Sequence, residues 1–140
     1  PIEGKQVHFA DTEFVLIEGN EERAMLHPTV ALIIDMIEEN KDIYKQFIEG
    51  ITKGGILIYN EEDLLLNELV GNNESPIRKM EYSIPAFETH NGETYLITPE
   101  GELPLGETSA EQLSYIEAAK WVCQNMGIDE ADFYEAMASI

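Results

Sequence analysis

Three uninterrupted apolar runs of strand length constrain the fold of this chain more than any other feature of its sequence. They are Phe14-Val15-Leu16-Ile17, Val30-Ala31-Leu32-Ile33-Ile34 and Ile56-Leu57-Ile58-Tyr59. Apolar and polar residues do not alternate in these runs, and β-branched residues are frequent, which is typical of strands buried on both faces. Such strands need helices on both sides of the sheet, so the sequence predicts an α/β fold with a reduced, mainly parallel sheet flanked by helices.

Helical patterns separate and follow the second and third runs. Residues 43–51 carry apolar side chains at helical spacing, and Gly54-Gly55 follows them as a helix stop. The order strand, helix, strand predicts a parallel βαβ unit. Residues 65–70 then predict a second, short helix that ends at Gly71.

The pattern changes between Arg78 and Leu105. Two tight turns are predicted there, at His90-Asn91-Gly92-Glu93 and at Thr98-Pro99-Glu100-Gly101. Apolar residues alternate with polar ones around these turns, which predicts a small antiparallel sheet with one covered face attached to the main sheet. The alternating residues are Tyr82, Ile84, Tyr95, Ile97, Leu103 and Leu105.

The last third of the chain predicts two helices. Thr108 or Ser109 is placed to cap the first, with Glu111 or Gln112 as the partner in a capping box. One apolar stripe runs along this helix, formed by Leu113, Ile116, Ala119, Cys123 and Met126. Asp129 is placed to cap the final helix.

Composition and charge narrow the class of protein. The chain has 140 residues, and its 44% of hydrophobic positions exclude a disordered tail. Cys123 is the single cysteine of this sequence, which excludes a scaffold held together by internal disulfides. Eight Lys+Arg against 28 Asp+Glu give a formal net charge of -20, which repels nucleic acid and anionic membrane surfaces. We see neither a secretory leader nor an apolar run of about 18 residues, and therefore expect a cytoplasmic protein without nucleic-acid or membrane partners.

Acidic residues follow each of the three apolar runs. Glu18 and Glu21 follow the first run, and Asp35, Glu38 and Glu39 follow the second. Because parallel strands end at the same edge of a sheet, these carboxylates are predicted to converge there, where they could hold Mg²⁺ or Ca²⁺. The alternative is that carboxylates cap helix N-termini, and this is the favoured interpretation for Glu61-Glu62-Asp63 after the third run.

The histidines offer no comparable signal. His8, His27 and His90 lie far apart and match no metal-ligand spacing. His90 is predicted to lie in a turn and to face solvent.

Five segments lie in the order found in a known family, at residues 14–21, 28–34, 54–63, 82–105 and 119–136. Taken together, they resemble the Mur ligases, the ATP-dependent enzymes that add amino acids or peptides to UDP-N-acetylmuramate. The branch that the chain resembles most is the murein peptide ligase, and the resemblance implies that residues 1–140 form a single domain similar to the central domain of that family. It also implies that Glu21 matches a glutamate that helps to hold Mg²⁺ in the family.

The departures from this family concern its chemistry. Within residues 1–140 we find no match to the family's phosphate-binding Gly-Lys-Thr loop or to the Trp-Asp-His that follows its second strand. The same residues contain no match to its N-terminal UDP-binding domain or to its C-terminal domain. Where the family has Gly-x-His-Asn-x-x-Asn at the start of the long late helix, this chain has Ser109, Glu111, Gln112 and Tyr115. The resemblance therefore implies a scaffold with no catalytic and no nucleotide-binding residues, for which no cofactor is expected and a bound Mg²⁺ ion is possible.

Three functions follow as hypotheses. The first is a non-catalytic Mur-ligase-like domain: a fragment, a degenerate relative or an engineered minimal version of a peptidoglycan-recycling ligase. The second is a part of an ATP-dependent UDP-N-acetylmuramate-peptide ligase that works when other segments supply the phosphate loop. A substrate of the UDP-N-acetylmuramate type is expected only if the other domains of such a ligase are present. The third is an acidic module that binds a divalent cation or a protein. In the family, a strand precedes the Gly-Lys-Thr loop at the start of the central domain, and this strand also has no match here. Its loss would expose part of the sheet, and we expect rearrangement or a homodimer contact to cover it.

Overall fold

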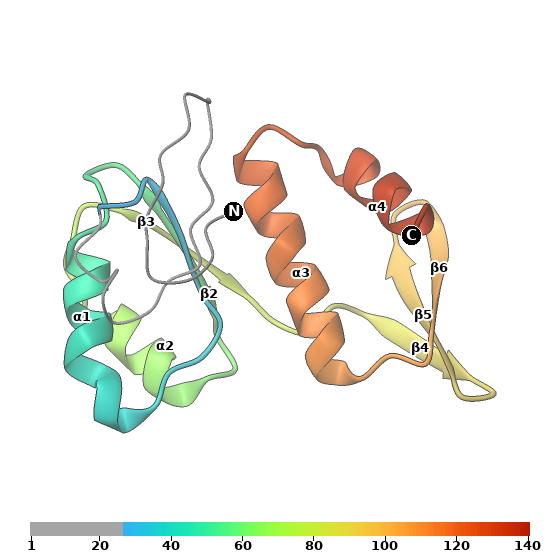
Figure 1. The fold of residues 1–140 in the computed structure, drawn as a ribbon, viewed down its shortest axis with the longest axis horizontal. Coiled ribbons are helices and arrows are strands. Elements are labelled where there is room, and N and C mark those ends of the chain that lie inside the picture. The colour runs from blue at the N-terminus through green and yellow to red at the C-terminus, as the bar shows by residue number, and fades with distance from the viewer. Residues whose placement is uncertain (1–26) are drawn as a thin grey trace, which may run out of the picture.

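The structure, a computed structural model, describes residues 27–140, and within them the chain is an α/β protein with two separate sheets. Helix α3 (Ala110–Asn125) lies between the sheets (Figure 1). A parallel sheet with two helices lies on one side of α3, and an antiparallel sheet with helix α4 (Glu130–Ala138) lies on the other. The predicted strand at residues 14–17 lies outside the described residues.

The parallel sheet has three strands in the order β1-β2-β3, and both strand pairs are parallel. A strand–helix–strand unit joins the first two strands, which confirms the predicted βαβ unit. The elements on this side are β1 (Val30–Ile33), the 3-10 helix η2 (Glu38–Asn40), α1 (Lys41–Glu49), β2 (Ile56–Asn60), α2 (Leu64–Gly71) and β3 (Arg78–Tyr82).

Strand β2 is buried on both faces, as its uninterrupted apolar sequence predicts. Successive side chains of a strand point to opposite faces. Leu57 and Tyr59 therefore pack with the helices α1 and α2, whereas Ile58 belongs to a second apolar cluster that includes Tyr82 and Ala118 of α3. The parallel sheet is thus covered by helices on both sides.

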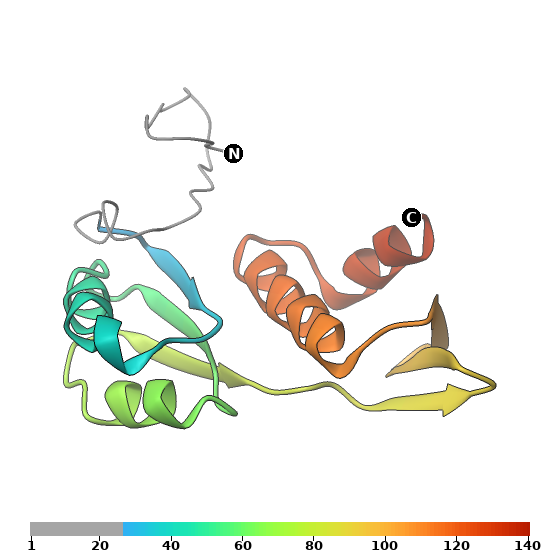
Figure 2. The same ribbon diagram turned by 60° about the horizontal axis from the view of Figure 1, so that its bottom comes forward.

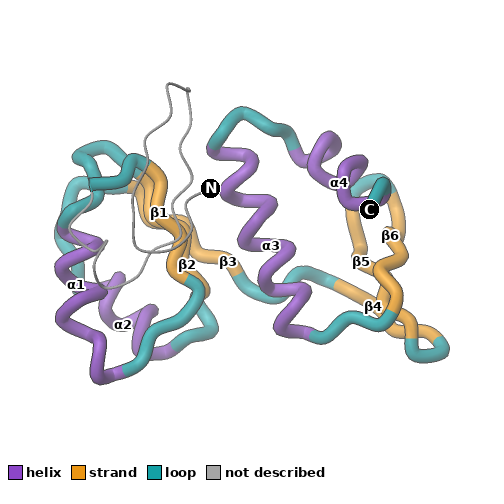
Figure 3. The backbone as a smooth tube through the Cα atoms, in the orientation of Figure 1, coloured by secondary structure: helices purple, strands orange, loops and turns teal. Residues whose placement is uncertain are grey.

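The antiparallel sheet is built from two successive hairpins, β4 (Phe87–His90), β5 (Glu93–Thr98) and β6 (Gly101–Gly106), in that order (Figure 3). Asn91 and Gly92 connect β4 to β5 with φ angles of 53° and 81°, the left-handed conformation that the predicted Asn-Gly turn requires. Leu96 in β5 is fully buried against Leu113 of α3 and Phe133 of α4. The predicted sheet with one covered face is confirmed.

One strand assignment from the sequence is wrong. Tyr82 ends β3 and pairs with Asn60 in the parallel sheet, and Ile84 lies in the connection that runs past α3 to β4 (Figure 2). The sequence of β3 is Arg78-Lys79-Met80-Glu81-Tyr82, which alternates because β2 is its one strand neighbour among the described residues and several of its side chains reach solvent. Alternation there reflects an edge position in a parallel sheet, not membership of the antiparallel sheet.

Helix α3 packs against both sheets, which explains a second difference from the sequence prediction. Ala119, which we assigned to a single apolar stripe, is exposed, whereas Ala118 is buried against the parallel sheet. Leu113 and Cys123 pack with the antiparallel sheet and α4. No helix in the described part of the chain is both long enough and apolar enough to span a bilayer.

Candidate metal centre on the antiparallel sheet

The carboxylates predicted to bind Mg²⁺ are only partly within the structure. Asp35 is exposed in the segment after β1, while Glu18 and Glu21 lie outside the described residues. The pKa of Tyr44 is raised by burial, and then by the charges of Asp35 and Asp63. The hydrogen bond from the Met36 N–H to Asp63 Oδ2 shows that the segments that follow β1 and β2 meet at one edge of the sheet. The metal set Glu18, Glu21 and Asp35 stays a prediction.

Asp63 caps a helix at this edge. Its Oδ1 accepts a hydrogen bond from the backbone N–H of Leu66 at 3.0 Å, in the first turn of α2. Its Oδ2 accepts from the N–H of Met36 at 3.1 Å. The capping interpretation is confirmed for Asp63, whose two oxygens each bind a backbone donor.

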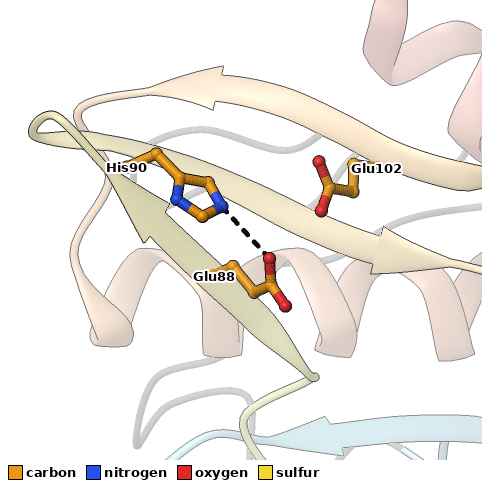
Figure 4. A group of neighbouring side chains, drawn as sticks. All are labelled: Glu88, His90 and Glu102. Carbon is orange, nitrogen blue, oxygen red and sulfur yellow. Dashed lines mark hydrogen bonds and ion pairs between the residues drawn. The ribbon is translucent and has the colours of Figure 1, made fainter.

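A different group of side chains comes together on the antiparallel sheet. Glu88, His90 and Glu102 each offer one ligand atom, and these atoms all lie within 4.8 Å of one another (Figure 4). Among residues 27–140 this is the one group of three or more His, Cys, Asp or Glu side chains with that geometry. It is distinct from the predicted acidic edge.

Strand alternation and hairpin register create this group. Glu88 and His90 are two residues apart on β4, so both side chains leave the same face of the sheet. Glu88 of β4 pairs with Tyr95 of β5, and Glu102 of β6 pairs with Ile97 of β5. All three ligand side chains therefore lie on the face opposite to Leu96, and they meet over the central strand (Figure 4).

The group is exposed and negatively charged. His90 Nε2 lies 3.1 Å from Glu88 Oε2, with 57% of the histidine and 54% of the glutamate side chain exposed. The ring of Tyr95 lies beside His90, with centroids 5.5 Å apart. The pKa of Tyr95 is raised, first by its hydrogen bond to Glu93, then by the charges of Glu93 and Glu102. Two carboxylates, those of Glu88 and Glu102, thus lie close to the imidazole.

Basic residues are missing from this part of the sequence. Between Lys79 and Lys120 the chain has no Lys or Arg. The same interval contains eight glutamates, at positions 81, 88, 93, 100, 102, 107, 111 and 117. Among the described residues neither Glu88 nor Glu102 forms a salt bridge with a lysine or arginine, which leaves both charges available to an external cation.

Sequence reasoning missed this group because it treated the histidines as isolated residues. His90 is the last residue of β4, so it carries the alternation of a strand. The Glu-x-His spacing at Glu88 was an available signal. Placing Glu102 beside it required the register of two hairpins, which includes a shift between Thr94 and Tyr95.

Fold and site together define an α/β protein whose separate antiparallel sheet carries a mixed carboxylate–imidazole donor set. Comparison with known proteins adds no narrower class. No protein-family model matches the chain, and no curated protein matches it.

Proposed function

We propose that this chain is a Mur-ligase-like domain that does not carry out ligation by itself. The proposal rests on the ordered sequence segments that resemble this family, and on the residues at the positions where its ligand-binding signature would stand. A peptidoglycan-recycling ligase is the parent enzyme that these segments indicate.

The order of elements supports the proposal. The resemblance implies core strands, then a small sheet, then closing helices along the chain. The described residues contain a parallel sheet with α1 and α2, an antiparallel sheet, and the helices α3 and α4, in that order. This order of elements is the one that the resemblance implies for the segments within residues 27–140, while the segment at residues 14–21 lies outside the described residues.

The start of α3 is the observation that carries the non-catalytic part of the proposal. The Ser109 hydroxyl accepts a hydrogen bond from the N–H of Gln112 at 3.1 Å, and the Gln112 side chain accepts one from the N–H of Ser109 at 2.9 Å. These are two of the positions that correspond to the family's His/Asn signature. Here their side chains complete a capping box, so they stabilise the helix end rather than reach for a nucleotide.

Calorimetric titration with Mg²⁺-ATP tests the proposal. We expect no binding heat, because no phosphate loop is present in this sequence and acidic residues dominate its charge. A Mur ligase that contains its Gly-Lys-Thr loop serves as the positive control. Binding of Mg²⁺-ATP at micromolar concentration would overturn the non-catalytic assignment.

An experimental structure tests the family assignment separately. We expect residues 27–140 to superpose on the central domain of a Mur ligase with the same strand order and the same connections. A different connectivity in the family's central domain would overturn the relationship, whatever the outcome of the ATP titration.

A further inference from the structure

We propose that Glu88, His90 and Glu102 form a binding site for a divalent transition-metal ion of the Zn²⁺ type. This inference goes beyond the proposed function and does not depend on it. It uses residues outside the acidic edge of the parallel sheet, and it rests on the juxtaposition of three ligand-bearing side chains from β4 and β6.

The donor set selects the class of ion. One imidazole nitrogen and two carboxylate oxygens are ligands that Zn²⁺ and its neighbours in the first transition row accept. Ca²⁺ takes six to eight oxygen ligands, and Mg²⁺ prefers octahedral oxygen with several retained waters. The contribution of His90 therefore favours a transition metal over either of these ions.

The geometry is close to that of a coordinated ion. Bond lengths of about 2.0–2.2 Å place the ligand atoms of a tetrahedral zinc site about 3.4 Å apart. His90 Nε2 and Glu88 Oε2 are already 3.1 Å apart. The Glu102 oxygen lies within 4.8 Å of both and belongs to an exposed, flexible side chain, so rotation of its torsions closes the site.

Three protein ligands leave room for a further ligand. A zinc site with three protein ligands normally keeps a water molecule at the fourth position. The side chains here are exposed, so water has free access. The ion would replace the direct contact between His90 and Glu88 and would balance the charge of the two glutamates.

The sheet beneath the group fixes where the ligands start. All three residues lie on paired strands, and strands hold a site more accurately than loops do. Leu96 anchors the central strand from the opposite face, where it is 1% exposed. Binding therefore requires side-chain rotation and no rearrangement of the backbone.

Isothermal titration with ZnCl₂ at about 0.15 M salt tests the site, because that salt concentration screens diffuse attraction to an acidic surface. We expect saturable 1:1 binding to the full chain. The variants Glu102→Gln and His90→Gln should each weaken Zn²⁺ binding at least about tenfold, since losing even an indirect supporting contact typically costs that much.

The matched control is Glu100→Gln. Glu100 is exposed in the turn just before Glu102, so this variant removes the same charge from the same hairpin without removing a proposed ligand. Its Zn²⁺ affinity should change less than about twofold. Equal losses in E100Q and E102Q, or undiminished binding by H90Q, would overturn the site in favour of diffuse charge attraction.

A second measurement does not rely on variants that must fold. Paramagnetic Co²⁺ added to the unmodified chain should broaden the NMR signals of the His90 ring before those of His27. The side chain of His27 instead hydrogen-bonds to the carbonyl oxygen of Gly50 through Nδ1, at 2.8 Å. Broadening that begins at His27 or His8, or affects all three histidines equally, would overturn the proposal.

Discussion

The carboxylate of Asp63 holds two segments of the chain at once. One oxygen caps α2 through Leu66, and the other binds the N–H of Met36, a residue that is 5% exposed and follows β1. A single side chain thus joins the ends of two neighbouring parallel strands. Its removal would leave a helix N-terminus uncapped and a buried donor without its partner.

We expect Asp63→Ala to lower the free energy of unfolding by about 2–4 kcal/mol. Loss of the cap costs about 1 kcal/mol, and the unsatisfied Met36 N–H adds a further 1–3 kcal/mol at most. Urea denaturation measures the change. Asp63→Asn keeps one acceptor oxygen, so its stability should lie between that of the parent chain and that of Asp63→Ala. A loss below about 0.5 kcal/mol in Asp63→Ala would contradict the double role.

Tyr82 differs from Asp63: its buried hydroxyl has no hydrogen-bond partner with normal bonding geometry among the described residues, although the Ser114 hydroxyl lies close enough to stabilise its charged form. Burial raises its pKa to about 12; the nearby Ser114 hydroxyl partly lowers it, and the charges of Asp35 and Tyr115 raise it. Tyr82→Phe removes this unsatisfied group. At pH 7 we expect the stability of the variant to equal that of the parent chain or to exceed it by up to about 1 kcal/mol.

The same substitution should alter the pH dependence of stability. An unfolded tyrosine titrates near pH 10, so between about pH 10 and 12 the unfolded chain has lost this proton while the folded chain keeps it. The contribution of Tyr82 is therefore complete below pH 10 and is lost as the pH rises through about 12. Urea denaturation from pH 9 to 12 should show a shallower decline for Y82F, and parallel curves would contradict this.

At the scale of elements, the N-terminus of α3 is the point where one change affects both sheets. The Ser109–Gln112 capping box begins a helix that packs on the parallel sheet through Ala118 and on the antiparallel sheet through Leu113. We expect Ser109→Ala to destabilise the chain by about 1 kcal/mol, as measured by thermal or urea unfolding. Ser109→Asp retains a capping oxygen and should cost little; equal losses in the two variants would show that the cap itself is not responsible.

The hairpin between β4 and β5 allows a test of backbone conformation alone. Gly92 has a φ angle of 81°, and among the described residues no heavy atom beyond its two chain neighbours lies within 4 Å of the Cβ that an alanine would add. Gly92→Ala should therefore cost about 1 kcal/mol of stability from backbone strain and not from a clash. If urea denaturation shows no loss, the turn adopts another conformation in solution.

How far the sequence predicts these elements depends on the number of neighbours that each one has. Strand β2 and the capped helix starts at Asp63 and Ser109 follow from local pattern, because two-sided burial and capping leave local signatures. Strand β3 and the second buried face of α3 could not be predicted from local pattern. Each contacts different surroundings on its different faces, so its sequence shows no single periodicity. The group at His90 was missed for the same reason: Glu102 reaches it only through the register of two strand pairs.

At the scale of the whole molecule, basic residues are distributed unevenly along the described chain. Five of them lie between residues 27 and 79, at positions 41, 45, 53, 78 and 79. Lys120 is the one Lys or Arg after residue 79, and it is paired with Glu117 at 2.8 Å. Cations should therefore be drawn first to the part of the molecule that contains the antiparallel sheet, where the proposed metal site lies.

Mg²⁺ offers a test of the other predicted site, at the acidic edge of the parallel sheet. If the chain is a scaffold without a bound cofactor, Mg²⁺ should raise the melting temperature no more than NaCl of the same ionic strength, because both act by screening repulsion. The double variant Glu21→Gln/Asp35→Asn should then be at least as stable as the parent chain, since it removes like charges. A specific Mg²⁺ site predicts the reverse: an added stabilisation that grows with Mg²⁺ concentration beyond the effect of salt and disappears in the double variant. Thermal unfolding across a Mg²⁺ series at constant ionic strength separates these results. The matched control is Glu49→Gln/Glu74→Gln, which removes two exposed charges from the segments that lead into β2 and β3 and leaves the predicted acidic edge intact.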